Sequence, residues 1–274
     1  MNKRILSTKE IQQESLRVMK VIHSFCVKNE IHYTLYGGSL IGAIRHNGFI
    51  PWDDDLDIAM PRPDYDKFIK TFDNSGNCKL FCLERKNSKK LYARVCDMEK
   101  TEAFVELPWF EEPLGVWIDI FPIDGVADDV TEHLLTIKKL KKLQHMTEIL
   151  RGKNCSFGIN EPFLKNIKTL AKNILFWWKD LDTVILEHDA LVRKYVYENA
   201  NFLGQLCFLR YPHKEHLSRH FYDSYELHDF AGEQFMIVSG YDGLLRNYFG
   251  DYMQLPPVEQ QVPMHSKVQG FYWK

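Results

Sequence analysis

Aspartates set inside apolar runs constrain this chain of 274 residues more than any other feature of its sequence. Asp55 and Asp57 enter the apolar run that ends at Met60, and Asp119 stands between two isoleucines. A charge in an apolar strand is costly unless it is paired or binds a metal. Residues two apart on a strand face the same side. We therefore expect Asp119 on a strand beside Asp55 and Asp57, where three carboxylates would hold divalent cations.

A Gly-Gly-Ser turn precedes these carboxylates. Gly37 and Gly38 let backbone amides approach a phosphate closely. Ser39 adds a hydroxyl and is expected to cap a short helix over residues 40–45. Glycines followed by alternate carboxylates predict a site for metal-assisted chemistry on phosphate.

The acidic run Asp53–Asp55 has a second interpretation. Taken alone, such a run is typical of a solvated turn that does no chemistry. The preceding glycines and the later Asp119 favour the metal site instead. In an extended chain Asp53 shares the face of Asp55 and Asp57, and Asp54 points away. Asp53 and Asp54 are then expected to support the residues that bind the metal.

Composition and charge exclude several classes of protein. The formal net charge of -2 gives no case for nucleic-acid binding. The polar start of the chain predicts no leader peptide, and no stretch reaches the ~18 apolar residues of a membrane-spanning helix. The 6 cysteines form no CxxC pair, which indicates reduced thiols in a cytoplasmic protein.

Patterning predicts an α/β (α+β) fold in three parts. Residues 1–127 form the catalytic core, a mixed sheet flanked by helices; residues 128–200 are helical; residues 201–274 return and pack on the core. An Asp-Gly turn at 124–125 is expected to end a strand. Helices are expected over 7–28, 40–45, 64–72, 128–150, 162–198 and 241–249, and strands over 31–36, 55–60, 78–83, 91–97, 101–106, 115–121 and 235–238.

The segment 163–179 has lysines around an apolar face that ends in Trp177-Trp178. This pattern is typical of an interfacial membrane helix. An amphipathic helix packed on the α/β part has the same pattern and is the preferred interpretation.

The string from Gly37 to Ile58 is specific enough to indicate a family. Its Gly-Ser turn followed by Asp55 and Asp57 resembles the nucleotidyltransferase signature, and Asp119 matches the third carboxylate of that fold. The full string, with its Arg-His-Asn-Gly-Phe-Ile-Pro-Trp segment, resembles the LicD family of phosphocholine transferases, to which fukutin is more distantly similar. Segments 118–124 and 249–257 resemble LicD motifs too.

The resemblance implies transfer of phosphocholine from CDP-choline to a sugar hydroxyl of a cell-surface glycan or teichoic acid precursor, with release of CMP. It implies Mg²⁺ as cofactor, as one ion or two, with Mn²⁺ as an alternative. Asp55 and Asp57 would bind the metal. Asp119 would complete the metal site or take the proton of the acceptor hydroxyl. Gly37, Gly38 and Ser39 would bind phosphate.

Other residues receive roles by the same reasoning. Arg45 would clamp a phosphate oxygen, and His46 either binds phosphate, acts as an acid or is a buried histidine. Choline recognition needs aromatic faces, and Trp52 is the first candidate. Trp109 and Trp117 flank the Asp119 motif, with Trp117 expected in the core. Two cations near the carboxylate motifs, Arg94 and Lys100, could each reach the donor, but solvated surface positions are the preferred interpretation for both.

The acceptor implied is a lipid-linked oligosaccharide or another glycan, and the location is cytoplasmic or at the inner face of the membrane. Three alternatives stay open. The chain would transfer another CDP-linked alcohol phosphate, from CDP-ribitol or CDP-glycerol, or it would be a nucleotidyltransferase that releases pyrophosphate from a nucleoside triphosphate. A binding protein that lost catalysis is disfavoured by the intact Asp55, Asp57 and Asp119.

Overall fold

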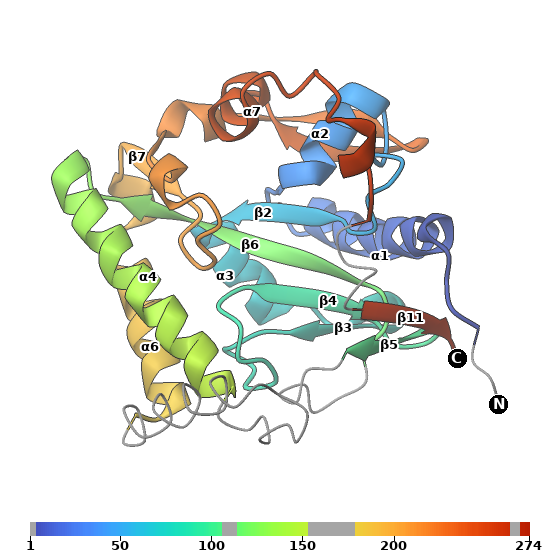
Figure 1. Cartoon of the computed structure of the whole chain (residues 1–274), viewed down its shortest axis with the longest axis horizontal. Coiled ribbons are helices and arrows are strands. Elements are labelled where there is room, and N and C mark those ends of the chain that lie inside the picture. Colours follow the sequence, from blue (N-terminus) through green and yellow to red (C-terminus); the bar gives the residue numbers. More distant parts are fainter. Residues whose placement is uncertain (1–3, 106–113, 153–178, 264–268) are drawn as a thin grey trace.

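A mixed sheet with helices around it forms the centre of the molecule (Figure 1). In this computed structural model, residues 4–105, 114–152, 179–263 and 269–274 are described. The helices are α1 (Thr8–Lys28), α2 (Gly37–His46), α3 (Arg62–Thr71), α4 (Val130–Gly152), α6 (Leu181–Val192) and α7 (Tyr241–Phe249). The strands are β1 (Thr34–Leu35), β2 (Asp57–Pro61), β3 (Cys78–Phe81), β4 (Ala93–Asp97), β5 (Thr101–Val105), β6 (Trp117–Val126), β7 (Phe202–Gly204), β8 (Leu217–Ser218), β9 (Tyr225–Phe230), β10 (Glu233–Val238) and β11 (Gln269–Trp273).

The main sheet has the order β1-β2-β6-β4-β3, and β7 and β8 extend it from β6. Strands β2 and β6 run parallel, whereas β4 and β7 pair with β6 in antiparallel fashion. The register sets Asp57 opposite Asp119. The predicted α/β class is confirmed, and so is the expectation that Asp119 lies on the strand beside Asp57.

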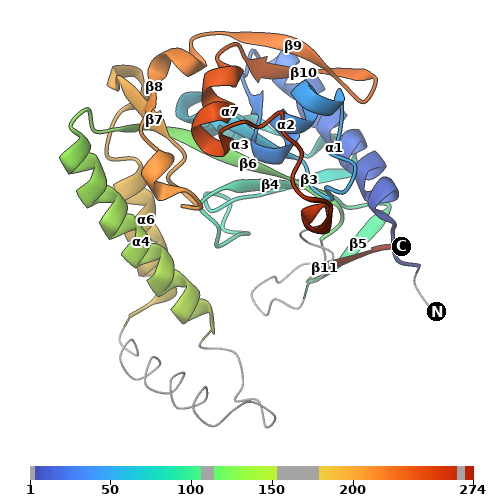
Figure 2. The same ribbon diagram turned by 45° about the horizontal axis from the view of Figure 1, so that its top comes forward.

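Helices and hairpins cover the sheet in separate groups. Helices α1 and α3 pack against β6, and α4 packs against α6 beside the β7 end of the sheet. Figure 2 shows α2, α7 and the β9–β10 hairpin gathered together, and contacts of α2 with both α7 and β9 confirm this grouping. The strand β11 pairs with β5 and brings the end of the chain next to residues 101–105.

Helix α1 begins where its sequence predicts. The Ser7 side chain accepts from the Glu10 backbone N–H at 3.4 Å, and the Glu10 carboxylate accepts from the Ser7 N–H at 2.9 Å. This reciprocal pair satisfies two N–H groups that a helix start leaves open. The helix ends at Asn29, as expected.

The expectation that Ser39 caps a helix over 40–45 is wrong. Helix α2 begins three residues earlier, at Gly37, with Tyr36 at the capping position and no side-chain cap. The Ser39 hydroxyl instead accepts from the Asp57 N–H at 2.9 Å. A contact with strand β2, 18 positions along the chain, has taken the place of the local cap.

The Asp-Gly turn expected at 124–125 is also wrong, because β6 continues through both residues to Val126. The buried Asp124 carboxylate accepts from Arg62 at 2.6 and 2.8 Å. Gly125 allows close approach of another segment, since a Cβ there would lie 2.9 Å from the Ala200 side chain and the Tyr195 carbonyl. Paired charge and close packing therefore override the turn signal.

The core draws on both ends of the chain. Phe230, Phe235 and Leu244, from the C-terminal part, belong to the same buried cluster as Ile58 and Ile120 of the central strands. The Val238 N–H donates to the Thr34 hydroxyl at 3.1 Å and ties β10 to β1. The division at residues 127 and 200 stays a prediction.

The segment 163–179 has two interpretations, a membrane-surface helix and a packed helix. All of this segment except Lys179 lies outside the described residues. Within the ranges that are described, no helix is long and apolar enough to cross a membrane.

The Arg62–Asp124 pair provides a test of this packing. Asp124→Leu removes the carboxylate that accepts two hydrogen bonds from the buried Arg62 and leaves Arg62 with the more distant Asp66 carboxylate, at 3.8 Å. The change is expected to lower the free energy of unfolding by about 3–5 kcal/mol. The double variant Arg62→Met, Asp124→Leu is expected to recover most of that loss, because both charges are then gone. Urea unfolding measures both.

The matched control is the exposed pair Lys20–Glu233, with side chains 52% and 37% exposed. Glu233→Gln is expected to cost less than about 1 kcal/mol. An Asp124→Leu variant as stable as Glu233→Gln would contradict the assignment.

Candidate active site

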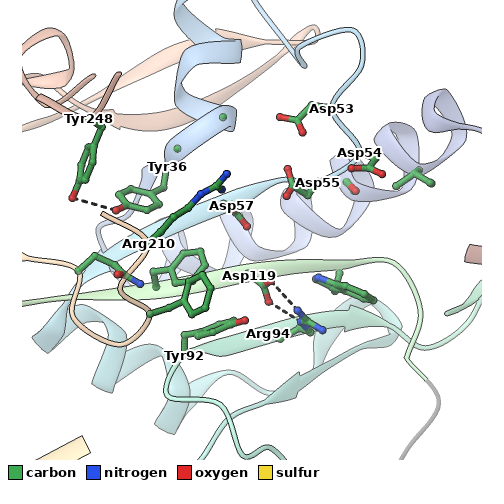
Figure 3. A pocket seen from close by; sticks show the side chains of 18 of the residues that line it. Tyr36, Asp53, Asp54, Asp55, Asp57, Tyr92, Arg94, Asp119, Arg210 and Tyr248 are labelled. Carbon is green, nitrogen blue, oxygen red and sulfur yellow. Dashed lines mark hydrogen bonds and ion pairs between the residues drawn. The ribbon is translucent and has the colours of Figure 1, made fainter. Parts of the chain in front are cut away.

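A cavity of about 440 Å³ opens beside Asp57 and Asp119. Figure 3 shows Asp53, Asp54 and Asp55 on one side, Asp57 and Asp119 in the middle, and Tyr36 and Tyr248 on the other side. Its volume is in the range of small-molecule sites. The charged residues that line it are Asp53, Asp54, Asp55, Asp57, Lys90, Arg94, Asp119, Arg210 and Glu215.

The predicted carboxylates gather in this cavity. Asp55 precedes β2, Asp57 begins it, and β6 supplies Asp119. Asp54, which was expected to point away, also lines the cavity and is 6% exposed. Burial raises the pKa of Asp57 well above its usual range, and the nearby Asp55, Asp119 and Asp53 charges raise it further. The site therefore concentrates negative charge that a bound cation would offset.

Arg94 is not the solvated surface cation that its sequence context predicts. Its guanidinium donates to both oxygens of Asp119, at 2.7 and 2.8 Å, and lies 3.9 Å from the ring centre of Trp117. Burial opposes its charge, but the Asp119 carboxylate raises the pKa of Arg94 above its ordinary value. Lys100 does remain open to solvent, with a side chain 46% exposed.

The carboxylates fit a hard divalent cation by charge and ligand type. Within the described residues, no group of three His, Cys, Asp or Glu side chains is arranged to hold a metal as it stands. Both Asp119 oxygens accept from Arg94, so Asp55 and Asp57 are the members that fit a metal best. The metal and the place of Asp119 among its ligands stay predictions.

The glycines stand at the start of α2, where helix N–H groups lack partners within the helix. Gly37 has a φ of 55°, in the left-handed region that favours glycine, and both Gly37 and Gly38 line the cavity. A Cβ on Gly38 would lie 2.7 Å from Asp53 Oδ2. Ser39 is buried and holds the Asp57 backbone through its hydroxyl. These positions suit phosphate binding at a helix N-terminus, which stays a prediction.

Arg45 and His46 connect α2 to the segment after α7. The Arg45 Nη1 donates to the carbonyl oxygens of Tyr252 at 2.7 Å and Gln254 at 3.2 Å. Its Nε donates to His46 Nε2 at 3.0 Å, and burial together with the Arg45 charge lowers the pKa of His46. Neither is among the residues that line the cavity in the described part of the chain. Their roles toward phosphate stay predictions.

Trp52 and Trp117 both line the cavity, and Trp117 also belongs to the core. Trp52 lines the cavity beside Asp53, and its role toward choline stays a prediction. Trp117 is confirmed as a core residue, 9% exposed with its ring 5.0 Å from that of Phe271. Trp109 lies outside the described residues.

Residues 205–215 and α7 supply a wall of the cavity that no sequence pattern predicted. Glu215 is 2% exposed, and its Oε2 accepts from the Gln205 N–H at 2.8 Å and the Tyr248 hydroxyl at 2.7 Å. Tyr36 donates in turn to the Tyr248 hydroxyl at 3.3 Å. Burial raises the pKa of Glu215 to about 8. No local pattern around Glu215 signals this role.

Lys90, which lies between the strands expected over 78–83 and 91–97, was not predicted as a site residue either. Its Nζ donates to the Tyr92 hydroxyl at 2.5 Å. Burial lowers the pKa of Lys90 to about 7, and the nearby Arg94 charge contributes. Lysine, arginine and carboxylates therefore surround one small volume.

The chain is similar to known proteins along most of its length. Residues 30–147 match the protein-family model described as LicD/FKTN/FKRP, nucleotidyltransferase domain. The lipopolysaccharide cholinephosphotransferase LicD of Haemophilus influenzae is 29% identical over 95% of this chain and 96% of that protein. The Rickettsia typhi protein RT0683 is 48% identical over 46% of this chain and 38% of its own, and RP689 of Rickettsia prowazekii is 31% identical over 31% and 38%.

The mixed sheet, the carboxylate-rich cavity and these similarities define the chain as a phosphotransferase enzyme. The family match lies in the core, and the similarity to a LicD protein extends along nearly the whole chain. Residues 30–147 form a LicD-family domain.

Glu215 is expected to make the free energy of unfolding depend on pH. Its pKa is about 8 in the folded protein, against an ordinary 4.5, so between these values the folded state holds a proton that the unfolded chain has lost. Stability therefore falls as the pH rises through this window, by up to about 1.4 kcal/mol per pH unit. Glu215→Gln stays neutral and is expected to remove this part of the slope.

Urea unfolding of wild type and Glu215→Gln between pH 5 and 8 measures the difference. The exposed Glu226→Gln is the matched control and is expected to keep the wild-type slope. Equal slopes for Glu215→Gln and wild type would contradict the raised pKa.

Proposed function

We propose that this enzyme transfers phosphocholine from CDP-choline to a sugar hydroxyl of a cell-surface glycan and releases CMP. The observation that carries the proposal is the similarity to the Haemophilus cholinephosphotransferase, which runs over 95% of this chain and includes every predicted site residue within its length. The geometry supports it, because the cavity joins three kinds of group. Carboxylates suit a divalent cation, helix N–H groups suit a diphosphate, and aromatic rings suit an organic cation.

The reaction forms a bond between the acceptor oxygen and the phosphorus next to choline, and it breaks the bond from that phosphorus to CMP. The acceptor hydroxyl loses its proton in the same process. Mg²⁺, when bound, would offset the charge on the diphosphate and on the departing CMP. Asp55 and Asp57 would hold it, with Asp119 as a third carboxylate.

This chain's own groups would orient the donor. The Gly37 and Gly38 amides at the start of α2 would face phosphate oxygens. Arg94, held in place by Asp119 and by the Trp117 ring, would present a fixed positive charge to the donor. Lys90 has a pKa of about 7, so an anionic donor would favour its protonated form. Asp119 or another carboxylate of the cavity would receive the acceptor proton.

The acceptor in this proposal is a lipopolysaccharide or teichoic acid precursor, as a lipid-linked oligosaccharide or a free glycan. Reaction at the cytoplasmic side of the membrane belongs to the same proposal. The five cysteines within the described residues are buried free thiols, which suits a reducing compartment.

One alternative keeps specific support. The matched family model carries the description of a nucleotidyltransferase domain, and the same carboxylates would serve attack on a nucleoside triphosphate. That reaction releases pyrophosphate, whereas phosphocholine transfer releases CMP.

A donor panel separates these reactions. CDP-choline, CDP-ribitol, CDP-glycerol and CTP are incubated with enzyme, Mg²⁺ and lipid-linked acceptors, and CMP and pyrophosphate are measured. We expect CMP from CDP-choline, none after removal of the metal with EDTA, and recovery when Mg²⁺ is restored. Pyrophosphate from CTP, without CMP from CDP-choline, would establish the nucleotidyltransferase instead.

Asp55→Asn and Asp57→Asn test the metal-binding roles. Each is expected to lower CMP release at least about 100-fold, because each weakens charge compensation worth several kcal/mol. Asp57→Asn is also expected to raise the melting temperature in EDTA, since it removes one of the crowded carboxylates.

The exposed Asp223→Asn is the control and is expected to leave both readouts at wild-type values. Wild-type turnover by Asp57→Asn would refute the role. Unchanged binding of CDP-choline by both site variants, with no turnover by wild type, would indicate a binding protein.

A further inference from the structure

Seven aromatic residues that line the cavity contact one another. They are Tyr36, Tyr92, Phe121, Phe208, Tyr211, Tyr248 and Phe249. Figure 3 labels Tyr36, Tyr92 and Tyr248, which lie on the side of Asp57 away from Asp53. No short stretch of sequence contains this group, because its members come from five separate segments of the chain.

The rings form a continuous series of contacts. From Phe208 the ring centres step to Tyr92 at 6.4 Å, to Phe121 at 4.7 Å and to Tyr36 at 5.8 Å. The series continues from Tyr36 to Tyr248 at 6.1 Å and to Tyr211 at 6.3 Å. Aromatic faces carry partial negative charge, and several of them around one volume favour an organic cation.

A buried carboxylate lies in the same wall. Both hydrogen bonds to Glu215 fall on Oε2, and within the described part of the chain Oε1 accepts none. Tyr248 belongs to the ring series and also donates to Glu215, so ring and carboxylate are held together. Burial raises the pKa of this carboxyl, and a cation beside it would favour its ionised form. Cation binding and ionisation of Glu215 therefore support each other.

Two cationic side chains of the protein lie against rings of this group. Lys90 Nζ lies 4.6 Å from the ring centre of Tyr92, and Arg210 Cζ lies 5.5 Å from that of Tyr211. Figure 3 shows Arg210 reaching between the aromatic side and Asp57. Arg210 therefore stands where the phosphate next to a bound organic cation would lie.

We propose that the aromatic residues named above, the aromatic wall, bind the quaternary ammonium of the donor together with Glu215. This site determines the donor specificity of the enzyme, and Trp52 lies on the nucleotide side of the cavity. This inference rests on the proposed function, since it names where the choline group of CDP-choline would bind. A quaternary ammonium donates no hydrogen bonds, so ring faces and a buried charge are what recognise it. The neutral ends of CDP-glycerol and CDP-ribitol would gain no charge attraction from Glu215.

Binding measurements with CDP-choline and with CMP isolate the phosphocholine contribution, because CMP lacks both the second phosphate and the choline. Wild type is expected to bind CDP-choline more tightly than CMP. Glu215→Gln and Tyr211→Leu are each expected to weaken CDP-choline binding about 10-fold and to leave CMP binding within about 2-fold of wild type. Tyr211→Phe keeps the ring and is expected to keep the preference. Glu226→Gln is the control for Glu215→Gln, and thermal unfolding confirms that each variant is folded.

Trp52→Leu tests which side of the cavity binds the choline group. We expect it to weaken CMP and CDP-choline alike, so that their ratio is unchanged. The inference is overturned if Trp52→Leu alone removes the preference, or if Glu215→Gln and Tyr211→Leu both keep the wild-type ratio. In those cases wild type still releases CMP from CDP-choline and the proposed function stands. Absence of that release in wild type would remove the proposed function and this inference together.

Discussion

Asp57 and Asp119 lie side by side in the interior of the sheet because β2 and β6 run parallel in one register. Two half-buried carboxylates side by side repel each other, and partial burial also disfavours their charge. The surrounding elements compensate: Arg94 binds both oxygens of Asp119 from β4, and the Ser39 hydroxyl holds the Asp57 backbone from α2. The start of α2 and the bend before β2 are thereby tied to one point, at which a diphosphate and its cation would bind.

The C-terminal part of the chain completes both the core and the cavity. Residues 205–215 and α7 supply Arg210, Glu215 and Tyr248 to a space whose other side comes from residues before 120. The cavity consequently has two characters, with crowded carboxylates at the sheet and aromatic rings around a buried carboxylate opposite them. A donor with a diphosphate in the middle and an organic cation at one end would match both.

Much of the fold follows from local patterns. The capping box predicted the start of α1, and the helix expected over 241–249 is α7. The alternation of Asp55 and Asp57 in an apolar run, with Asp119 in another, predicted two neighbouring strands and their shared site. Local patterns misjudged Ser39 and Asp124, since each side chain has a partner on another element that overrides a cap or a turn.

The carboxylates were readable from the linear chain because a charge in an apolar strand is costly wherever that strand packs, so its presence already implies a partner. The residues that pair with these carboxylates could not be predicted from the sequence. Arg94 looked like a surface cation until antiparallel pairing of β4 with β6 set it opposite Asp119. Glu215 became part of the cavity only through burial against Gln205 and Tyr248, the latter 33 positions away. Such contacts depend on how distant segments pack, and no spacing or periodicity in the sequence carries that information.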